Sequence, residues 1–199
     1  MLLFHVPGSR STRVLWTLEE IGRPYDLTRL TWDERKGDEH RRRHPLGKVP
    51  AFEFDDGQVL FESVAICLQL ADLYPDAGLL PAVGSADRGR VYQWSVFAIA
   101  ELEKVAFPWN RARRGGEDET ETAEKFAPVG EAMRAALAAA GPWIAGEDFS
   151  VADISLVSIL RNTVELGLLE PGDPLTEYVE RGLARPAQLR ADAAGAKSD

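Results

Sequence analysis

The chain has 199 residues, 45% of them hydrophobic, and a formal net charge of −9 at pH 7. This length accommodates one domain or two small ones with a buried core. The negative charge argues against a nucleic-acid partner, because phosphate binding needs a clustered basic surface. No apolar stretch is long enough to span a bilayer and no signal-peptide pattern opens the chain, so we expect a cytoplasmic protein without membrane contact.

The first 76 residues predict a small α/β domain. Apolar or alternating runs predict strands at 2–6, 25–31, 51–55 and 58–61, and amphipathic spacing predicts helices at 9–22, 33–43 and 62–74. Gly22 stands where a first helix would end, and Asp55-Asp56-Gly57 suits a hairpin turn. The order of elements predicts a four-stranded mixed sheet with helices packed on it.

A second, all-helical domain is predicted for residues 86–199, after a linker at 77–85 that is rich in proline and glycine. Residues 87–105 and 120–140 carry apolar stripes at helical spacing, and the polar segment 115–119 predicts a mobile loop between them. After Pro186 the residues are small and polar, so we expect the last eight to be disordered.

Ser150 and Asp153 form the signature of a helix start. Ser150 can cap the N–H three residues on, while the Asp153 carboxylate can accept from the Ser150 N–H, with Phe149 and Ile154 as a hydrophobic staple. A serine near an aspartate also suggests a hydrolase, but the nucleophile-elbow pattern and a positioned histidine are missing. We therefore assign both residues to folding.

Cysteine and histidine content limits the chemistry available. Cys67 is the only cysteine, which excludes an intramolecular disulfide and a Cys-x-x-Cys redox pair, and its apolar surroundings predict a buried, inert thiol. The three histidines lack metal-binding spacing, so we expect no metal. His5 lies in a predicted buried strand, where a satisfied core histidine is expected rather than a base.

The most informative segment is residues 44–52, His-Pro-Leu-Gly-Lys-Val-Pro-Ala-Phe. Pro50 directly precedes a predicted strand, a position at which proline is tolerated. A cis bond between Val49 and Pro50 would turn the Val49 backbone outward as a pairing edge, where an extended peptide could dock as an added strand. Glu62 and Ser63 follow twelve residues later, at the predicted start of the third helix.

These features together resemble the cytosolic glutathione transferases, in particular bacterial-like enzymes of serine type. Four segments carry the resemblance: Pro-Gly-Ser-Arg-Ser-Thr-Arg-Val-Leu at 7–15, Leu-Gly-Lys-Val-Pro at 46–50, Glu-Ser-Val-Ala-Ile at 62–66, and the capping box at 150–153. The resemblance covers nearly the whole chain. It implies a thioredoxin-like N-terminal domain that binds glutathione, with a helical domain lining the electrophile site.

In such enzymes the cysteinyl backbone of glutathione pairs with the residue before the cis-proline, which here is Val49, beside Pro50. The resemblance implies that Ser63 holds the γ-glutamyl carboxylate at a helix N-terminus, where the helix dipole favours an anion. It implies Glu62 for the ligand's ammonium group and Lys48 for the glycyl carboxylate. His40 or one of Arg41, Arg42 and Arg43 is a further candidate, although this basic run also fits a solvated helix face.

The family ionises the glutathione thiol with a Tyr, Ser or Cys hydrogen-bond donor just after the first strand. This chain offers neither tyrosine nor cysteine there, but it offers Ser9, Ser11 and Thr12. Counting back from Arg13 places Ser9 where serine-type enzymes carry the catalytic hydroxyl, with Ser11 as the second choice. Any of the three could instead cap the helix.

The electrophile pocket is expected to take residues from the helical domain. The candidates are Trp94, Phe97, Glu101, Phe107, Trp109 and Asn110. Aromatic stripes on helices are more often core, so we expect about two of these to reach a ligand. The helical domain is short for the family and its tail offers no aromatic residue, which predicts an open site.

The resemblance implies a detoxifying transferase that conjugates the glutathione thiolate, as co-substrate, to small apolar electrophiles, and that forms a homodimer. Two alternatives remain open at this point. The same fold could serve as a non-catalytic glutathione-binding or protein-interaction module, or it could catalyse a glutathione-dependent isomerisation or peroxide reduction. Reductive chemistry through Cys67 is disfavoured, because this residue is far in sequence from the predicted active-site turn.

Overall fold

The computed structural model describes residues 1–196, which form two compact units. The first unit comprises Met1–Ala77 together with residues 185–196, and the second comprises Gly78–Ala184. The predicted boundary after residue 76 falls one residue from this division. The segment 185–196, predicted as part of the helical domain, instead groups with the N-terminal residues.

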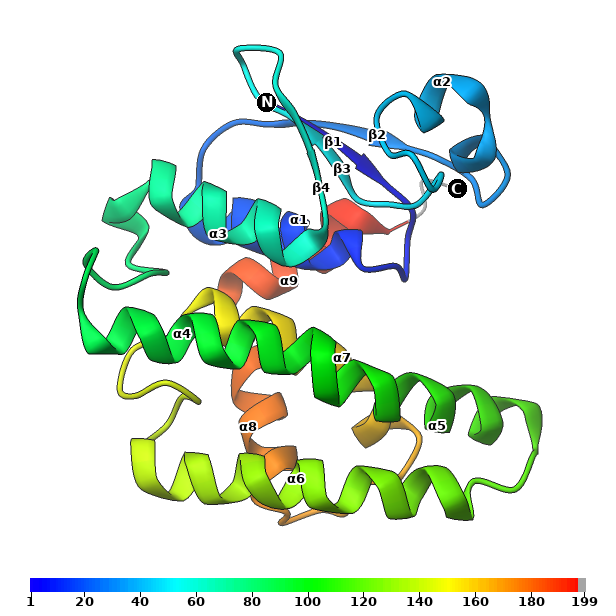
Figure 1. The fold of residues 1–199 in the computed structure, drawn as a ribbon, viewed down its shortest axis with the longest axis vertical. Helices are drawn as coiled ribbons and strands as arrows, with labels where there is room; N and C mark the ends of the chain where they lie inside the picture. The colour runs from blue at the N-terminus through cyan, green and yellow to red at the C-terminus, as the bar shows by residue number, and fades with distance from the viewer. Residues whose placement is uncertain (197–199) are drawn as a thin grey trace. The chain divides into compact units, whose positions relative to one another are not determined.

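The first unit is built on a four-stranded sheet with the order β2-β1-β3-β4 (Figure 1). Its strands are β1 (Leu2–His5), β2 (Asp26–Arg29), β3 (Ala51–Glu53) and β4 (Val59–Phe61). β1 pairs parallel with β2 and antiparallel with β3, and β3 pairs antiparallel with β4. The predicted α/β fold with a mixed four-stranded sheet, thioredoxin-like in its order of elements, is confirmed.

This topology brings three chain segments to one edge of the sheet. Since β1 and β4 both run antiparallel to β3, the ends of β1 and β4 and the start of β3 lie at the same edge. The register places Phe4 opposite Ala51, and Ala51 opposite Phe61. The residues that follow β1, precede β3 and follow β4 therefore share that edge.

Helices α1 (Ser11–Ile21) and α3 (Ser63–Leu73) pack together on one face of this sheet (Figure 1). α1 ends at Gly22, which adopts the left-handed conformation (φ 70°) and donates its N–H to the Leu18 carbonyl. Successive strand residues point to opposite faces, so His5 of β1 faces α1 while Phe4 faces away. The Phe4 ring meets His40 of α2 (Asp38–Arg41) at a centroid distance of 5.9 Å.

The helix predicted over 33–43 is wrong as a continuous element. The structure has a 3-10 turn, η1 (Glu34–Lys36), followed by the single-turn helix α2. Gly37 separates them with an extended conformation (φ −68°, ψ 157°), which ends one element and begins the next. The polar and charged residues at the remaining positions of 33–43 are compatible with a helix, but Gly37 interrupts the ladder of helical hydrogen bonds.

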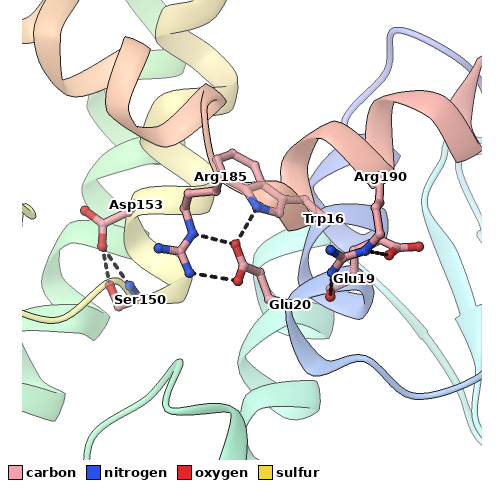
Figure 2. Close-up of polar contacts among 7 residues, drawn as sticks. All are labelled: Trp16, Glu19, Glu20, Ser150, Asp153, Arg185 and Arg190. Carbon is pink, nitrogen blue, oxygen red and sulfur yellow. Dashed lines mark hydrogen bonds and ion pairs between the residues drawn. The ribbon is translucent and has the colours of Figure 1, made fainter.

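Residues 186–195 form helix α9 (Pro186–Gly195), which packs on α1 and includes residues 192–195 of the tail expected to be disordered. Two arginines attach this C-terminal segment to α1 (Figure 2). Arg185 binds both carboxylate oxygens of Glu20 at 2.6 and 2.8 Å, and Arg190 Nε donates to Glu19 at 2.8 Å. These long-range pairs explain the disagreement, because composition alone does not report them. Residues 197–199, also in that predicted tail, lie outside the described part of the chain.

The second unit is helical throughout its described secondary structure. α4 (Ala86–Phe97) continues through the π-helical segment η3 (Ala98–Leu102) into α5 (Glu103–Gly115), and α6 (Thr120–Ala140), α7 (Val151–Glu165) and α8 (Pro174–Leu183) follow. A 3-10 turn, η2 (Pro75–Ala77), ends the N-terminal segment of the first unit. α7 is the central helix, since it contacts α4, α5 and α8 and buries most of its residues. No helix among residues 1–196 is both long and apolar enough to cross a membrane.

The predicted capping box at the start of α7 is present (Figure 2). The fully buried Asp153 carboxylate accepts from the Ser150 N–H at 2.9 Å and the Ser150 hydroxyl at 2.8 Å. It also accepts from the Ile144 N–H at 2.9 Å and the Tyr178 hydroxyl at 2.7 Å. Ser150 and Asp153 therefore join α7 to the preceding loop and to α8, a folding role.

Candidate functional site

Ser9 lies just after β1, at the sheet edge where the three segments meet. Its side chain is partly exposed, and its hydroxyl accepts the Ser11 N–H at 3.3 Å, which satisfies one of the open donors at the start of α1. The Ser9 carbonyl accepts from the Thr12 N–H at 3.1 Å and the Thr12 hydroxyl at 2.9 Å. The turn is therefore ordered by its own hydrogen bonds and leaves Ser9 open to solvent.

Ser11 is fully buried, in contrast to Ser9. Its hydroxyl lies 2.7 Å from the Ser9 hydroxyl and 2.7 Å from Nδ1 of His5. His5 is also fully buried, and burial lowers the pKa of its ring below the ordinary value. The structure thus brings the two predicted serines together, and only Ser9 can touch a ligand from solvent.

The loop before β3 is fixed by a turn and by two side chains. Gly47 adopts a left-handed conformation (φ 57°) and donates to the His44 carbonyl at 2.8 Å. A Cβ atom there would lie 2.9 Å from the Arg35 carbonyl, so glycine is required. The Gly47 carbonyl accepts from Arg35 at 2.6 Å, and the Lys48 carbonyl forms a 2.8 Å hydrogen bond with Nε2 of His40.

Lys48, Val49 and Pro50 follow this turn at the shared sheet edge. The Val49–Pro50 peptide bond is cis. The Lys48 side chain is exposed, whereas Val49 and Pro50 are buried. His40, a candidate ligand contact from the sequence, is 2% exposed and holds the Lys48 backbone.

Glu62 and Ser63 follow β4 and begin α3. Glu62 is exposed and has a positive φ of 73°, the only such value for a non-glycine residue among residues 1–196. Backbone strain of this kind in a non-glycine residue is typical of functional sites. Glu62 is the N-cap residue of α3, and no acidic side chain lies within the first turn of that helix.

Ser63 is backed by a buried arginine. Arg13 of α1 is 2% exposed and its Nη1 donates to the Ser63 hydroxyl oxygen at 3.3 Å. A guanidinium group only donates, so the Ser63 hydroxyl accepts here and its own hydrogen remains available to another acceptor. The pair therefore presents a hydroxyl donor, supported by a positive charge, at the start of α3.

The other basic side chains of the first unit and its thiol contact protein groups or solvent. Arg41 and Arg42 are exposed, as expected for a solvated face, whereas Arg43 is partly buried, pairs with Glu39 at 2.8 Å and lies over the Phe4 ring at 4.2 Å. His44 is buried against the Phe61 ring, and burial lowers its pKa. The predicted burial of Cys67 is confirmed, and it raises the pKa of the thiol to about 11.

The aromatic candidates of the helical unit all lie on the continuous segment α4–η3–α5. Trp94 and Phe97 pack edge to face at 4.8 Å, and Glu101 is exposed on η3. Trp94, Trp109 and Asn110 are 8%, 2% and 5% exposed. Phe107 is partly exposed. All six residues stay candidates for the electrophile site.

A cavity of about 540 Å³ lies in the second unit between the start of α4 and the loop before α7. Asp87, Arg90, Phe149 and Ser150 are among its lining residues, and none of the predicted electrophile candidates lines it. It is therefore distinct from the predicted pocket. No group of His, Cys, Asp or Glu side chains within residues 1–196 is arranged to hold a metal ion.

Comparison with known proteins places this geometry in a family. Residues 8–73 match the N-terminal domain of glutathione S-transferases. The glutathione S-transferase GstA of Escherichia coli O157:H7 is 32% identical, with 94% of each chain covered. The chain belongs to the glutathione S-transferase family. It is a bacterial-like cytosolic member of this family of enzymes, as the sequence resemblance predicted.

Solved glutathione transferases share the fold over nearly the whole chain. The enzyme from Methylococcus capsulatus strain Bath superimposes with a TM-score of 0.86 at 31% identity, covering 98% of both chains. A sphingomonad glutathione S-transferase complexed with glutathione superimposes with a TM-score of 0.83, also at 31% identity and with 98% of both chains covered. The two-part fold of the transferase is thereby confirmed.

Three residues of this transferase were not identified from the sequence as supports of the site. In the sequence Arg13 serves only to locate Ser9 within the first motif, and Arg35 falls in a predicted charged helix. His5 was expected to be a core histidine without a link to the site. No local pattern identified Arg13, because it lies off the apolar stripe of the first helix and is buried where α1 packs on α3. The contact between His5 and Ser11 depends on how β1 packs on α1, which no local pattern reports.

Proposed function

We propose that this protein conjugates the glutathione thiolate to small apolar electrophiles. One observation carries the proposal: the topology brings Ser9, the Lys48–Pro50 segment and the Glu62–Ser63 pair to one edge of the sheet. These are the groups needed to hold an extended tripeptide by its two ends and its middle. Support comes from the sphingomonad relative, which was solved with glutathione bound.

Each end of glutathione has a matching group. Ser63 donates its hydroxyl to the γ-glutamyl carboxylate, supported by Arg13 and by the N-terminus of α3. The exposed Glu62 carboxylate takes the ammonium group, and Lys48 takes the glycyl carboxylate. The backbone of Val49, next to Pro50, pairs with the cysteinyl residue as an added strand.

Ser9 is the hydroxyl that stabilises the thiolate. Ser9 is partly exposed, whereas Ser11 is fully buried, so only Ser9 can touch the sulfur. A thiol with a pKa of about 8.5 needs about 2.7 kcal/mol of preferential thiolate stabilisation to ionise two pH units lower. One charge-assisted hydrogen bond together with a helix N-terminus supplies energies of this order.

The proposed enzyme is a cytoplasmic homodimer of detoxifying type. Tyr92, Val96 and Ile99 are 40%, 55% and 37% exposed, and they recur at helical spacing along α4 and η3. An exposed apolar stripe of this kind favours association with a second copy. The exposed stripe supports the dimer, and light scattering of the protein and of a Val96→Glu variant tests it: we expect the variant to be monomeric.

Steady-state conjugation of glutathione to an activated aryl halide tests the proposed function. We expect Ser9→Ala to lower kcat/KM by about 10²-fold, of the order found for a single donor to a developing anion. Ser158→Ala is a matched control, because it also removes a serine hydroxyl, here one that donates to the Ile154 carbonyl within α7. A wild-type protein without turnover would overturn the transferase activity, and an unimpaired Ser9→Ala would overturn the role of Ser9.

A further inference from the structure

A continuous chain of hydrogen bonds runs inward from Ser9 to the C-terminal helix. The Ser9 and Ser11 hydroxyl oxygens are 2.7 Å apart, and the Ser11 oxygen is 2.7 Å from Nδ1 of His5. On the other side of the ring, Nε2 of His5 lies 3.4 Å from the Gly195 carbonyl oxygen at the end of α9. All four residues belong to the first unit.

The partners determine where the hydrogens lie. The Gly195 carbonyl can only accept, so Nε2 of His5 carries a hydrogen and donates. In the neutral ring Nδ1 then has a lone pair and accepts the Ser11 hydroxyl hydrogen, since it is much nearer than the Val6 carbonyl at 3.3 Å. The Ser11 oxygen in turn accepts the Ser9 hydroxyl hydrogen. In the free protein Ser9 therefore donates inward and presents a lone pair outward.

The inward donation of the Ser9 hydroxyl hydrogen is incompatible with a thiolate bound at Ser9. A thiolate needs the Ser9 hydrogen to point outward. If His5 stayed neutral, two lone pairs would then face each other, either between Ser9 and Ser11 or between Ser11 and His5. At 2.7 Å such a contact is an unmade hydrogen bond in a buried site. In the other neutral tautomer, with the hydrogen on Nδ1, the conflict would move to Nε2, whose lone pair would face the Gly195 carbonyl oxygen at 3.4 Å. All of these contacts are hydrogen bonds only when both ring nitrogens of His5 carry hydrogens.

We propose that His5 receives the proton of the glutathione thiol through Ser9 and Ser11. The thiol S–H bond breaks and its proton goes to Ser9, which passes its own to Ser11, which passes its own to Nδ1 of His5. The product is a thiolate accepting from Ser9, with an imidazolium donating to Ser11 and to Gly195. No charge is gained or lost by the site. His5 acts through two hydroxyls, so it is a positioning residue that also stores the proton.

The surroundings of His5 fit this role. Burial lowers the pKa of His5, and Arg29 of β2 acts in the same direction, so the ring is neutral in the free protein and needs the negative charge of the thiolate to hold a second hydrogen. The Gly195 carbonyl acts in the opposite sense by favouring the protonated ring. Gly195 is packed so closely that a Cβ atom there would lie 3.3 Å from Nε2. The C-terminal helix thus fixes the tautomer on which the chain depends.

This inference rests on the proposed function, and nitrogen NMR of the histidine side chains tests it on the wild-type protein. We expect His5 to show the neutral Nε2–H form in the free protein and with S-methylglutathione, which has no thiol hydrogen. With glutathione we expect the doubly protonated form. Thiolate absorbance in the ultraviolet, recorded on the same samples, reports separately whether the thiol ionises.

Proton release on binding gives a second readout, from calorimetry in buffers of different ionisation enthalpy. Near pH 7 we expect the wild type to release almost no proton, and His5→Asn to release up to about one per thiolate formed. Asparagine keeps an acceptor at the position of Nδ1 but cannot hold the proton. Tyr178→Phe is the control for lost stability, since it removes a buried hydrogen bond in the other unit. It should behave as wild type.

The outcomes separate the two claims. A thiolate with His5 still neutral, or with a full proton released by the wild type, would overturn the relay and leave the transferase proposal standing. Binding of glutathione without a thiolate, or no binding, would overturn the proposed function and the relay with it. A thiolate accompanied by a protonated His5 supports both.

Discussion

Replacing Asp153 by asparagine should lower the free energy of unfolding of the helical unit by more than the small change in side-chain shape suggests. Each carboxylate oxygen accepts from one backbone N–H: one from Ile144 and the other from Ser150. An asparagine places an NH₂ group at one of these positions whichever way it is turned. The hydroxyls of Ser150 and Tyr178 can rotate to accept from it, but a backbone N–H cannot. One buried donor is therefore always left without an acceptor.

The magnitude follows from the hydrogen bonds that this substitution breaks or weakens. An orphaned buried donor costs about 1–3 kcal/mol, and the charge-assisted bonds that become neutral add a comparable amount. We expect the free energy of unfolding to fall by about 3–5 kcal/mol, as for other broken buried networks. For a chain of this length each kcal/mol lowers Tm by about 2–4 °C, so Tm should drop by about 6–20 °C.

Urea unfolding followed by circular dichroism measures this change, with Tyr178→Phe as the matched comparison. That variant removes one donor and orphans no backbone group, because the Ile144 N–H keeps its acceptor. We expect it to cost about 1.5–3 kcal/mol, less than Asp153→Asn. If Asp153→Asn costs no more than Tyr178→Phe, the reasoning from the backbone donors is refuted.

Three further predictions concern the first unit. Glu62→Gly should raise the free energy of unfolding by up to about 2 kcal/mol, since glycine relieves the strain of a positive φ at a smaller entropic cost. Calorimetry should show weaker glutathione binding by this variant. A lower free energy of unfolding would refute the argument that Glu62 is strained. Arg13→Met should weaken glutathione binding about tenfold, because Ser63 loses its charged donor. The same substitution should not change the affinity for a glutathione analogue that lacks the γ-glutamyl α-carboxylate. Equal losses of affinity for both ligands would mean that Arg13 has a purely structural role. Burial lowers the pKa of His5 and His44, so their contribution to stability is present above about pH 6.5 and is lost as pH falls through the folded-state values. Denaturation between about pH 7 and pH 5 should show a falling free energy of unfolding, and replacing both histidines by asparagine should remove most of that slope.

The sequence predicted the elements whose signals are local. The first helix shows its apolar stripe and Gly22, so the predicted range 9–22 lies close to the observed Ser11–Ile21. The Ser150 and Asp153 caps likewise located the start of α7. The C-terminal helix has mostly small residues, and it is held by packing on α1 and by Arg185 and Arg190, which bind glutamates of α1. That information lies about 165 residues away in the sequence.

The sequence predicted the residues that we propose to contact glutathione, but it did not predict the residues that support them. Ser9, Lys48 and Ser63 belong to short motifs with a recognisable order. His5 and Arg13 act from behind these residues, and their partners are set by the packing of α1 against β1 and α3. A motif records what a site must present to a ligand, whereas the groups behind it depend on the whole fold.

An ultraviolet difference titration of bound glutathione across pH tests the central claim most directly, because it reports binding and ionisation of the thiol together. We expect saturable binding with a thiol pKa about two units below the value of about 8.5 for a free thiol. The same titration of Ser9→Ala should move the pKa back toward that value. Saturable binding by the wild type with an unshifted thiol would contradict the account, because the site would then hold glutathione without activating it.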